Sequence, residues 1–270
     1  ALTAWKFCGH YKELPEMNLA CSGMAPKGKM EDWVKLVGKV ERAEDKTRME
    51  NGMKTLYEHF QLAPELGSLL DPITIKADAF TASFEELEPV LRRALENEAD
   101  EEQVERGVMA AGIAKAGQLL SKKYTLQITN VPYLSIGKQE NILADYCKDN
   151  YSNSNGDLAT VFLDRMLKQT VVGGISSCVT LQNWLFLKNF RRLRENLLKS
   201  KRIKFIARLG ARCFQTPMWD FNVMLIGVQQ HKPDDNDQVL GIDVSIMPSP
   251  AEKDHELKSD KHIFINQLKQ

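Results

Sequence analysis

The sequence is poor in the features that mark secretion, membrane insertion or a bound metal. It has no run of about 18 apolar residues, as a membrane-spanning helix requires, and no signal peptide at its N-terminus. Its five cysteines are scattered, form no C-x-x-C pair and lie at no zinc-ligand spacing with the five histidines. We therefore expect a cytoplasmic protein with no membrane contact, no disulfide framework and no metal site.

The chain also lacks a net charge, because Lys+Arg and Asp+Glu both number 36. No overall basicity therefore indicates a nucleic-acid partner. The charges are unevenly distributed, however: residues 188–212 carry ten basic side chains and one acid, Glu195, whereas residues 85–105 carry nine acids and two arginines. Such segments can create a local positive field in a neutral protein, although a solvated helix face is the commoner explanation of a basic run.

Length and composition favour a globular α/β protein. The 270 residues, 43% hydrophobic and 27% charged, suffice for one large domain or one domain with insertions. Residues 1–7 are typical of a helix already in progress, without a capping residue before it, so we expect a piece of a longer protein.

Strand-like segments alternate with helix-sized segments along the chain, which favours a doubly wound sheet. We expect Asp157 to cap a helix, and the glycine pair at 173–174 to form a turn before a strand. The last two strands are expected to be antiparallel neighbours across the loop at 232–238. The expected helices are 1–7, one or two within 32–60, 84–122, 157–168 and 189–200, and the expected strands are 18–21, 73–80, 124–129, 175–180, 203–207, 221–228 and 241–246.

Asn130, Val131, Pro132 and Tyr133 directly follow the strand-like run at 124–129. In an open α/β sheet, ligands bind outside the carboxyl ends of the strands. The Asn130 side-chain oxygen and a carbonyl of Val131 or Pro132 can accept both hydrogens of an exocyclic amine, which stabilises the charge that develops when that nitrogen attacks a methyl group. Tyr133 can stack on the base. Taken alone, the four residues also fit an ordinary turn after a strand.

Several segments together resemble the adenine-specific N6 DNA methyltransferases, most closely the large enzymes of BREX-type phage-defence systems. The resemblance lies in residues 129–134 (TNVPYL), 137–139 (GKQ), 157–163 (DLATVFL) and 182–187 (QNWLFL), with support from 18–23 and 207–210. These segments follow the family's order and extend over about residues 1–228.

The resemblance implies that Asn130 binds the target amine, Pro132 shapes the loop and Tyr133 stacks on an adenine turned out of the duplex. The family's motif is Asp/Asn-Pro-Pro-Tyr/Phe/Trp, and this chain has Val131 at the second position. Because a valine keeps the backbone carbonyl, we expect altered rigidity rather than lost chemistry.

The resemblance also implies S-adenosylmethionine as cofactor and a Rossmann-like methyltransferase fold. Asp78 and Phe80 fit the family's cofactor-binding strand end, although a turn cap and a core residue explain them as well. The glycine-rich cofactor loop and its strand should lie upstream of Ala1 and are absent from the sequence. Residues 1–270 would then be a partial catalytic domain with helical insertions at about 27–70 and 84–122.

Four residues are candidates for substrate contact. Trp184 can line the target-base pocket or pack in the core between its apolar neighbours. Lys188, Arg191 and Arg192 can bind DNA phosphates.

The sequence thus predicts a fragment of a site-specific adenine methyltransferase acting on double-stranded DNA, in phage defence or restriction-modification, with other defence-system proteins as further partners. An RNA or protein-glutamine methyltransferase is the alternative, and a non-catalytic DNA-binding or assembly module is another.

Overall fold

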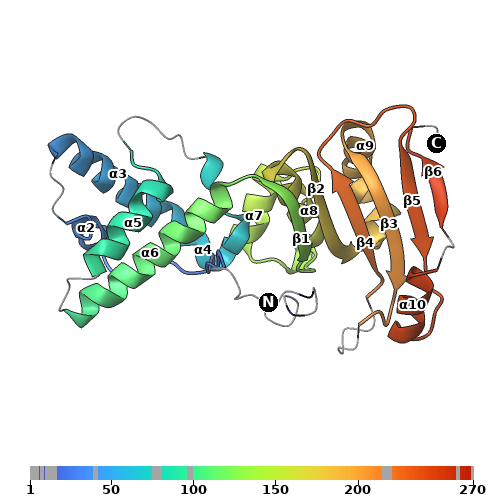
Figure 1. The fold of residues 1–270 in the computed structure, drawn as a ribbon, viewed down its shortest axis with the longest axis horizontal. Coiled ribbons are helices and arrows are strands. Elements are labelled where there is room, and N and C mark those ends of the chain that lie inside the picture. The colour runs from blue at the N-terminus through green and yellow to red at the C-terminus, as the bar shows by residue number, and fades with distance from the viewer. Residues whose placement is uncertain are drawn as a thin grey trace. The chain divides into compact units, whose positions relative to one another are not determined.

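The computed structural model describes residues 6, 9, 17–38, 42–74, 81–95, 100–214, 221–259 and 262–268. The chain divides into two compact units, Ala1–Lys122 and Lys123–Gln270, labelled by element in Figure 1. Each unit is described by itself. The expected single partial domain, with insertions at about 27–70 and 84–122, stays a prediction.

All the secondary structure described in the first unit is helical, and irregular segments such as residues 17–29 connect or precede the helices. The helices expected within 32–60 and over 84–122 are confirmed, and the second is divided in two. Asp100 caps the last helix by accepting a hydrogen bond from the backbone of Glu102 at 3.2 Å. The buried core includes Trp33, Met53 and Phe60. The helices are α2 (Met30–Lys35), α3 (Ala43–His59), α4 (Ala63–Leu66), α5 (Phe84–Leu95) and α6 (Glu101–Ser121), with 3-10 turns at Phe60–Leu62, Gly67–Leu69 and Pro72–Thr74.

Two strands expected in this unit are not observed as such. The prediction of a strand at 18–21 is wrong. These residues are exposed and pair with no strand in the described part of the chain. The strand expected over 73–80 begins as the 3-10 turn Pro72–Thr74, and its remainder lies outside the described residues. A short strand-like pattern forms a strand only when a partner supplies its hydrogen bonds.

The second unit contains a six-stranded mixed sheet in the order β1-β2-β4-β3-β5-β6. Strands β1, β2, β3 and β5 run in one direction, and β4 and β6 run against them. The expected α/β class with antiparallel C-terminal strands is therefore confirmed. The strands are β1 (Tyr124–Asn130), β2 (Thr170–Leu181), β3 (Arg202–Gly210), β4 (Val223–Gln229), β5 (Gln238–Asp243) and β6 (Ile263–Asn266).

Helices cover both faces of this sheet. Cys178 of β2 belongs to the larger core, which includes residues of α8 and α9, whereas the next residue, Val179, packs with the smaller core beside Leu257 of α10. Alternate residues of a strand point to opposite faces, so the two cores lie on opposite sides of the sheet. The helices are α7 (Asn141–Asn150), α8 (Leu158–Gln169), α9 (Arg191–Ser200) and α10 (Pro250–Leu257), with 3-10 turns at Ile136–Lys138, Asn183–Leu185 and Lys188–Phe190.

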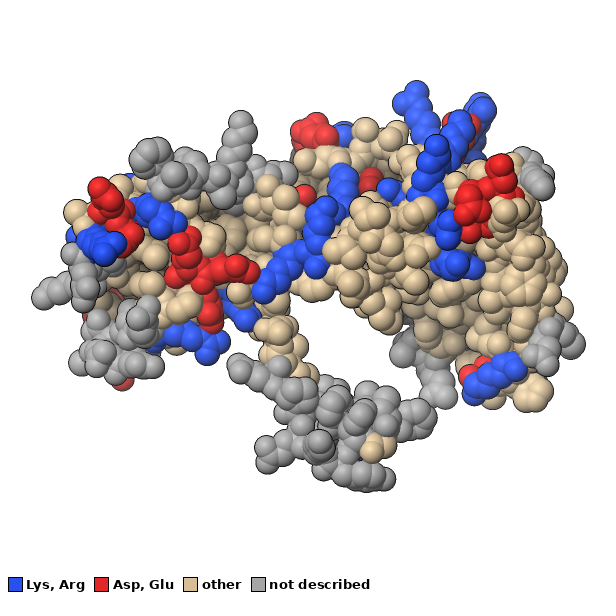
Figure 2. Space-filling view, turned by 45° about the horizontal axis from the view of Figure 1, so that its top comes forward, with Lys and Arg blue, Asp and Glu red and all other residues tan. Residues whose placement is uncertain are grey.

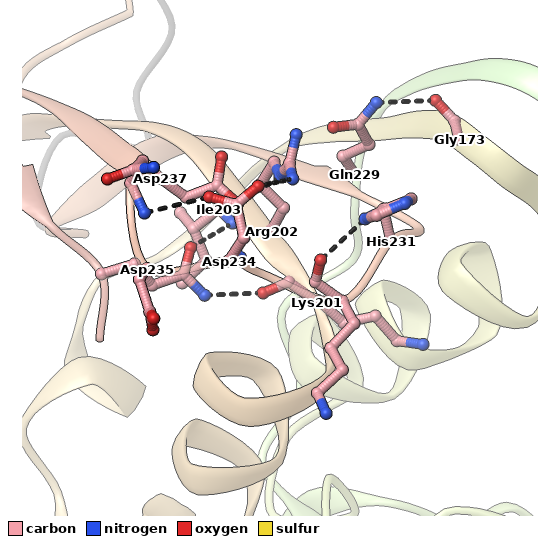
Figure 3. Close-up of polar contacts among 12 residues, drawn as sticks. Gly173, Lys201, Arg202, Ile203, Gln229, His231, Asp234, Asp235 and Asp237 are labelled. Carbon is pink, nitrogen blue, oxygen red and sulfur yellow. Dashed lines mark hydrogen bonds and ion pairs between the residues drawn. The ribbon is translucent and has the colours of Figure 1, made fainter.

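The last two strands expected from the sequence are not neighbours, and that prediction is wrong. β3 lies between β4 and β5 and pairs with both. A strand can form hydrogen bonds along both of its sides, and β3 does so with β4 and β5. Arg202, the first residue of β3, also forms ion pairs with Asp234 (2.9 Å) and Asp237 (2.5 Å) of the loop before β5 (Figure 3). Asp237 also accepts a hydrogen bond from the Asp234 backbone at 2.8 Å. The loop is therefore bound to Arg202, and β5 adds to the far side of β3.

The glycine pair at 173–174 is also placed differently from the prediction. Both glycines lie inside β2, where the pairing register with β1 shifts between Tyr124 and Leu126. Gly173 has a φ of 84°, a conformation that favours glycine, and its carbonyl accepts a hydrogen bond from Gln229 at 2.9 Å (Figure 3). The pair is therefore an irregularity within the strand rather than a turn before it.

Candidate functional site

The ends of four parallel strands define the candidate site. Asn130 ends β1, Gln182 follows β2, Gly210 ends β3 and Asp243 ends β5. Because these strands run in one direction, the four positions share one edge of the sheet. Open α/β sheets bind ligands at this kind of edge.

Asn130 and Tyr133 are joined by a hydrogen bond at this edge. The Tyr133 hydroxyl donates to Asn130 Oδ1 at 3.0 Å. Val131 lies between them with its side chain in the larger core, 3% exposed, and its backbone nitrogen donates to the Val179 carbonyl at 3.4 Å. Pro132 is exposed. The loop thus presents an amide and a proline outward and is fixed from below by a buried valine.

The Tyr133 ring is fixed on several sides. It is half-buried, packs against both cores and lies with its centroid 5.9 Å from that of Phe221, at an interplanar angle of 51°. Burial raises the pKa of Tyr133 to about 12, with smaller contributions from Cys213, Cys178 and Asp157. The hydroxyl therefore remains a protonated donor at any physiological pH.

The segment at 156–158 holds the loop that follows Tyr133. Leu158 donates its backbone N–H to the Leu134 carbonyl at 3.0 Å, and Ile136 donates to the Gly156 carbonyl at 3.1 Å. The Gln139 side chain donates to the same Leu134 carbonyl at 3.0 Å. These contacts make the exposed loop a rigid element.

Asp157 joins this loop to α8. It caps α8 as expected, accepting a hydrogen bond from the Ala159 backbone at 2.9 Å. Burial raises the pKa of the Asp157 carboxyl, and the backbone N–H groups of Ala159 and Leu134 oppose that rise. One carboxylate therefore serves both the helix end and the loop.

The four main segments that carry the family resemblance meet at this edge. Residues 129–134, 137–139 and 157–163 are connected by the hydrogen bonds to the Leu134 carbonyl. Residues 182–187 reach the same region because Trp184 and Leu185 pack in the core that contains Val131. Segments that are far apart in sequence therefore build one structure.

Arg208 is held beside an exposed phenylalanine on the same edge. Its Nη1 donates to Asp243 Oδ2 at 2.7 Å, and its Nε donates to Gln182 Oε1 at 3.3 Å. The guanidinium carbon lies 5.8 Å from the centroid of the Phe186 ring. A cation at this distance from an aromatic face is attracted to it.

Sequence reasoning did not identify Phe221, Phe186 or Arg208 as site residues. Phe221 reaches Tyr133 only because β4 inserts between β2 and β3, a pairing that no local pattern predicts. Phe186 belongs to an apolar run typical of a core, and Arg208 belongs to a basic run. Only the register Arg208↔Asp243 distinguishes this arginine from the others.

The predicted substrate-contact residues have different environments. Trp184 is 2% exposed within the larger core, so a base could reach it only if that core opened. Lys188, Arg191 and Arg192 are exposed at the start of α9, and Arg191 pairs with Glu195 at 2.7 Å. Figure 2 shows that Lys and Arg side chains gather over part of the second unit, with acidic side chains beside them.

The predicted cofactor residues, Asp78 and Phe80, lie outside the described residues. Within the described ranges, no three His, Cys, Asp or Glu side chains group as metal ligands would. In the same ranges, no helix is both long and apolar enough to span a bilayer.

Comparisons with known proteins agree with the sequence resemblance. The family model "Eco57I restriction-modification methylase" matches residues 33–214. The adenine-specific methyltransferase PglX of Lacticaseibacillus casei (strain Zhang) is 31% identical over 180 residues, which is 64% of this chain and 14% of PglX. The adenine-specific methyltransferase BrxX of Escherichia coli O9:H4 (strain HS) is 28% identical over 155 residues, 57% of this chain and 12% of BrxX. This chain therefore spans a small part of either relative.

Among solved structures, a DrdV–DNA complex is similar with a TM-score of 0.44 and 13% identity, over 59% of this chain and 19% of that one.

Proposed function

Because the chain belongs to the Eco57I restriction-modification methylase family, as its resemblance to adenine-specific methyltransferases predicted, we propose that it forms the amine-binding part of a DNA methyltransferase. The protein transfers a methyl group from S-adenosylmethionine to the N6 amine of adenine in double-stranded DNA, in restriction-modification or phage defence. The relatives PglX and BrxX carry adenine-specific methyltransferase in their names, which supports the class of reaction.

The observation that carries this proposal is the fixed amide at the sheet edge. Asn130 is exposed, and Tyr133 holds its Oδ1 at 3.0 Å. A carbonyl oxygen has two lone pairs, so Oδ1 can accept an amine hydrogen while it accepts the tyrosine hydroxyl. A site whose acceptors are already oriented stabilises developing charge without reorganising.

The neighbouring residues complete the recognition of the amine. The carbonyl of Val131 or Pro132 accepts its second hydrogen, and burial of the Val131 side chain limits movement of that carbonyl. With both hydrogens held, the nitrogen lone pair is directed away from the adenine ring. Tyr133, supported by Phe221, offers a face on which the base stacks.

The methyl donor supplies an electrophilic methyl group when bound. We assign its adenine contacts to Asp78 and Phe80, which fit the family's strand-end pattern.

Lys188, Arg191 and Arg192 contribute phosphate contacts in this proposal. All three are exposed where α9 begins, after the segment that contains Trp184. Neutralising a phosphate releases counterions, so each lost contact should reduce the salt slope of DNA binding by about 0.9. The effect should be equal for all DNA sequences, because phosphate contacts carry no sequence information.

Methyl transfer by the full-length protein tests the proposal directly. Radiolabelled S-adenosylmethionine is offered with unmethylated duplex DNA, RNA and a protein substrate in parallel. We expect label on DNA adenine, and we expect Asn130→Ala to abolish it. The matched control is Asn141→Ala, which removes an exposed asparagine at the start of α7 and should leave the rate unchanged.

Two other results of this assay would point to the alternative functions. Label on RNA or on protein glutamine, sensitive to Asn130→Ala, would assign the same site to the alternative substrate class. DNA binding without label on any substrate would indicate a binding or assembly module.

A further inference from the structure

The segment between β2 and α9 has two buried and two exposed apolar side chains close together. Trp184 and Phe190 are 2% and 4% exposed, whereas Phe186 and Leu187 are 65% and 47% exposed. The second pair stands out from a segment that otherwise supplies the core. Neighbouring large apolar side chains at a surface are a candidate contact for a partner.

The exposed pair is held rigidly by its backbone. The N–H groups of Phe186 and Leu187 both donate to the Asn183 carbonyl at 3.0 Å. Arg194 Nη1 donates to the carbonyls of Trp184 at 2.6 Å and of Leu187 at 2.7 Å. Phe186 and Leu187 are therefore presented by a fixed frame, which reduces the entropy lost when they bind.

Arg208 extends this apolar surface with a flat cation. Asp243 and Gln182 hold its Nη1 and Nε, and its guanidinium carbon lies 5.8 Å from the Phe186 ring centroid. The side chain remains 37% exposed. Aromatic rings and guanidinium groups both stack on nucleobases, with little regard to base identity.

This surface is connected to the amine site through the backbone. Gln182, which contacts Arg208, donates its N–H to the Asn222 carbonyl at 2.9 Å. Phe221, the residue before Asn222, contacts the Tyr133 ring. The exposed apolar pair thus lies near a site that, in the proposed function, receives an adenine taken out of the DNA stack.

Resting on the proposed function, we propose that Phe186 and Leu187, with Arg208 beside them, stack on the nucleobases next to the extruded adenine. Extrusion breaks stacking contacts, and its free energy falls when another flat or apolar surface replaces them. DNA-bending proteins insert phenylalanine and leucine side chains between base steps in this way. Lys188, Arg191 and Arg192 follow Leu187 in the chain and are exposed. Their positive charges can pair with the DNA phosphates beside the stacking surface.

The test compares methylation of two duplexes by the full-length protein. In the first, the target adenine is paired with thymine; in the second, it faces an abasic site and is already loosely stacked. We expect Phe186→Ala to slow methylation of the paired duplex about tenfold and to change the rate on the abasic duplex by less than about twofold, because extrusion there costs less. Leu187→Asn, a second variant, should show the same contrast.

A fluorescent base, 2-aminopurine, placed beside the target adenine reports stacking independently of turnover. Its fluorescence, which stacking quenches, should stay low when wild-type protein binds and extrudes the adenine, and should rise when the Phe186→Ala protein does so. Phe264→Ala is the matched control, because Phe264 is 61% exposed on β6, and this variant should behave like wild type in both measurements.

The outcomes separate the two proposals. If Phe186→Ala slows methylation of both duplexes equally, or of neither, the stacking proposal is wrong. The proposed function still stands in that case, provided that the wild type methylates the DNA. A wild-type protein inactive on both duplexes would overturn both.

Discussion

The Tyr133 hydroxyl donates a hydrogen bond to Asn130 Oδ1 at 3.0 Å, so the aromatic ring and the amide of one short loop form a single unit. Tyr133 is itself fixed by both cores and by Phe221. The packed sheet therefore fixes the position of the tyrosine, and the tyrosine fixes the orientation of the exposed Asn130 amide. The tyrosine has two separable roles in the proposed function, since its ring can stack and its hydroxyl orients Asn130.

Tyr133→Phe separates the two roles. The ring remains, and a hydrogen bond worth about 0.5–1.5 kcal/mol is lost, which corresponds to a fall in kcat of roughly 2- to 13-fold. We expect KM for DNA to stay near its wild-type value, whereas Tyr133→Ala should change both constants. Steady-state methylation kinetics measure this. A Tyr133→Phe protein with wild-type kcat would show that the hydroxyl does not position Asn130.

Alkaline pH should affect stability through the same tyrosine. Burial raises the pKa of Tyr133 to about 12, above the value of about 10 in an unfolded chain. The folded state therefore holds the phenol proton more tightly. The stabilisation is fully present below about pH 10 and is lost as pH rises toward 12. Urea unfolding at pH 8 and pH 11 should show a larger loss for wild type than for Tyr133→Phe, and equal losses would contradict the assignment.

Asp157 offers a test of how the loop is supported. Asp157→Ala removes the cap of α8 and should lower the free energy of unfolding by about 0.5–2 kcal/mol. It should also slow methylation, because the segment at 156–158 holds the Leu134 carbonyl and the loop after Tyr133. Asp157→Asn keeps a capping oxygen and removes a buried charge, so its stability should lie near that of wild type. Urea denaturation midpoints of the two variants decide this; equal destabilisation would mean that the charge itself is needed.

Local sequence signals were sufficient where short-range chemistry decides the structure. Asp157 is predicted as a cap because an aspartate directly before a helical pattern can accept a backbone hydrogen bond, and it does so from Ala159. The strand into Asn130 is predicted because its composition and its proline boundary are local. The same holds for the helices α3 and α6 of the first unit.

Long-range pairing explains what could not be predicted. β4 lies between β2 and β3 because of contacts that no pattern in its own sequence specifies. β5 pairs with β3, more than thirty residues earlier in the chain, and the ion pairs of Arg202 with two aspartates of the loop before β5 join equally distant residues. Phe221 lies just before β4, which begins at the edge beside the ends of β2 and β3, so its contact with Tyr133 could not be predicted either.

A pair of glycines in α6 tests the packing of the first unit. A Cβ added at Gly117 would lie 2.7 Å from Phe84 Cδ2, whereas one at Gly112 would lie 3.6 Å from Met24 Cε, an ordinary contact. Both positions are inside the same helix, so both gain about 0.5–1 kcal/mol of helix stability when alanine replaces glycine. Only Gly117→Ala adds overpacking, which costs about 1–3 kcal/mol.

We therefore expect Gly112→Ala to stabilise α6 and Gly117→Ala to destabilise it, as measured by hydrogen exchange of the α6 amides. Shortening the obstructing side chain in a Gly117→Ala, Phe84→Leu double variant should recover part of the loss, because the added methyl group then has room. Equal shifts for the two single variants would show that Phe84 does not pack against Gly117, and the association of α5 with α6 would need another explanation.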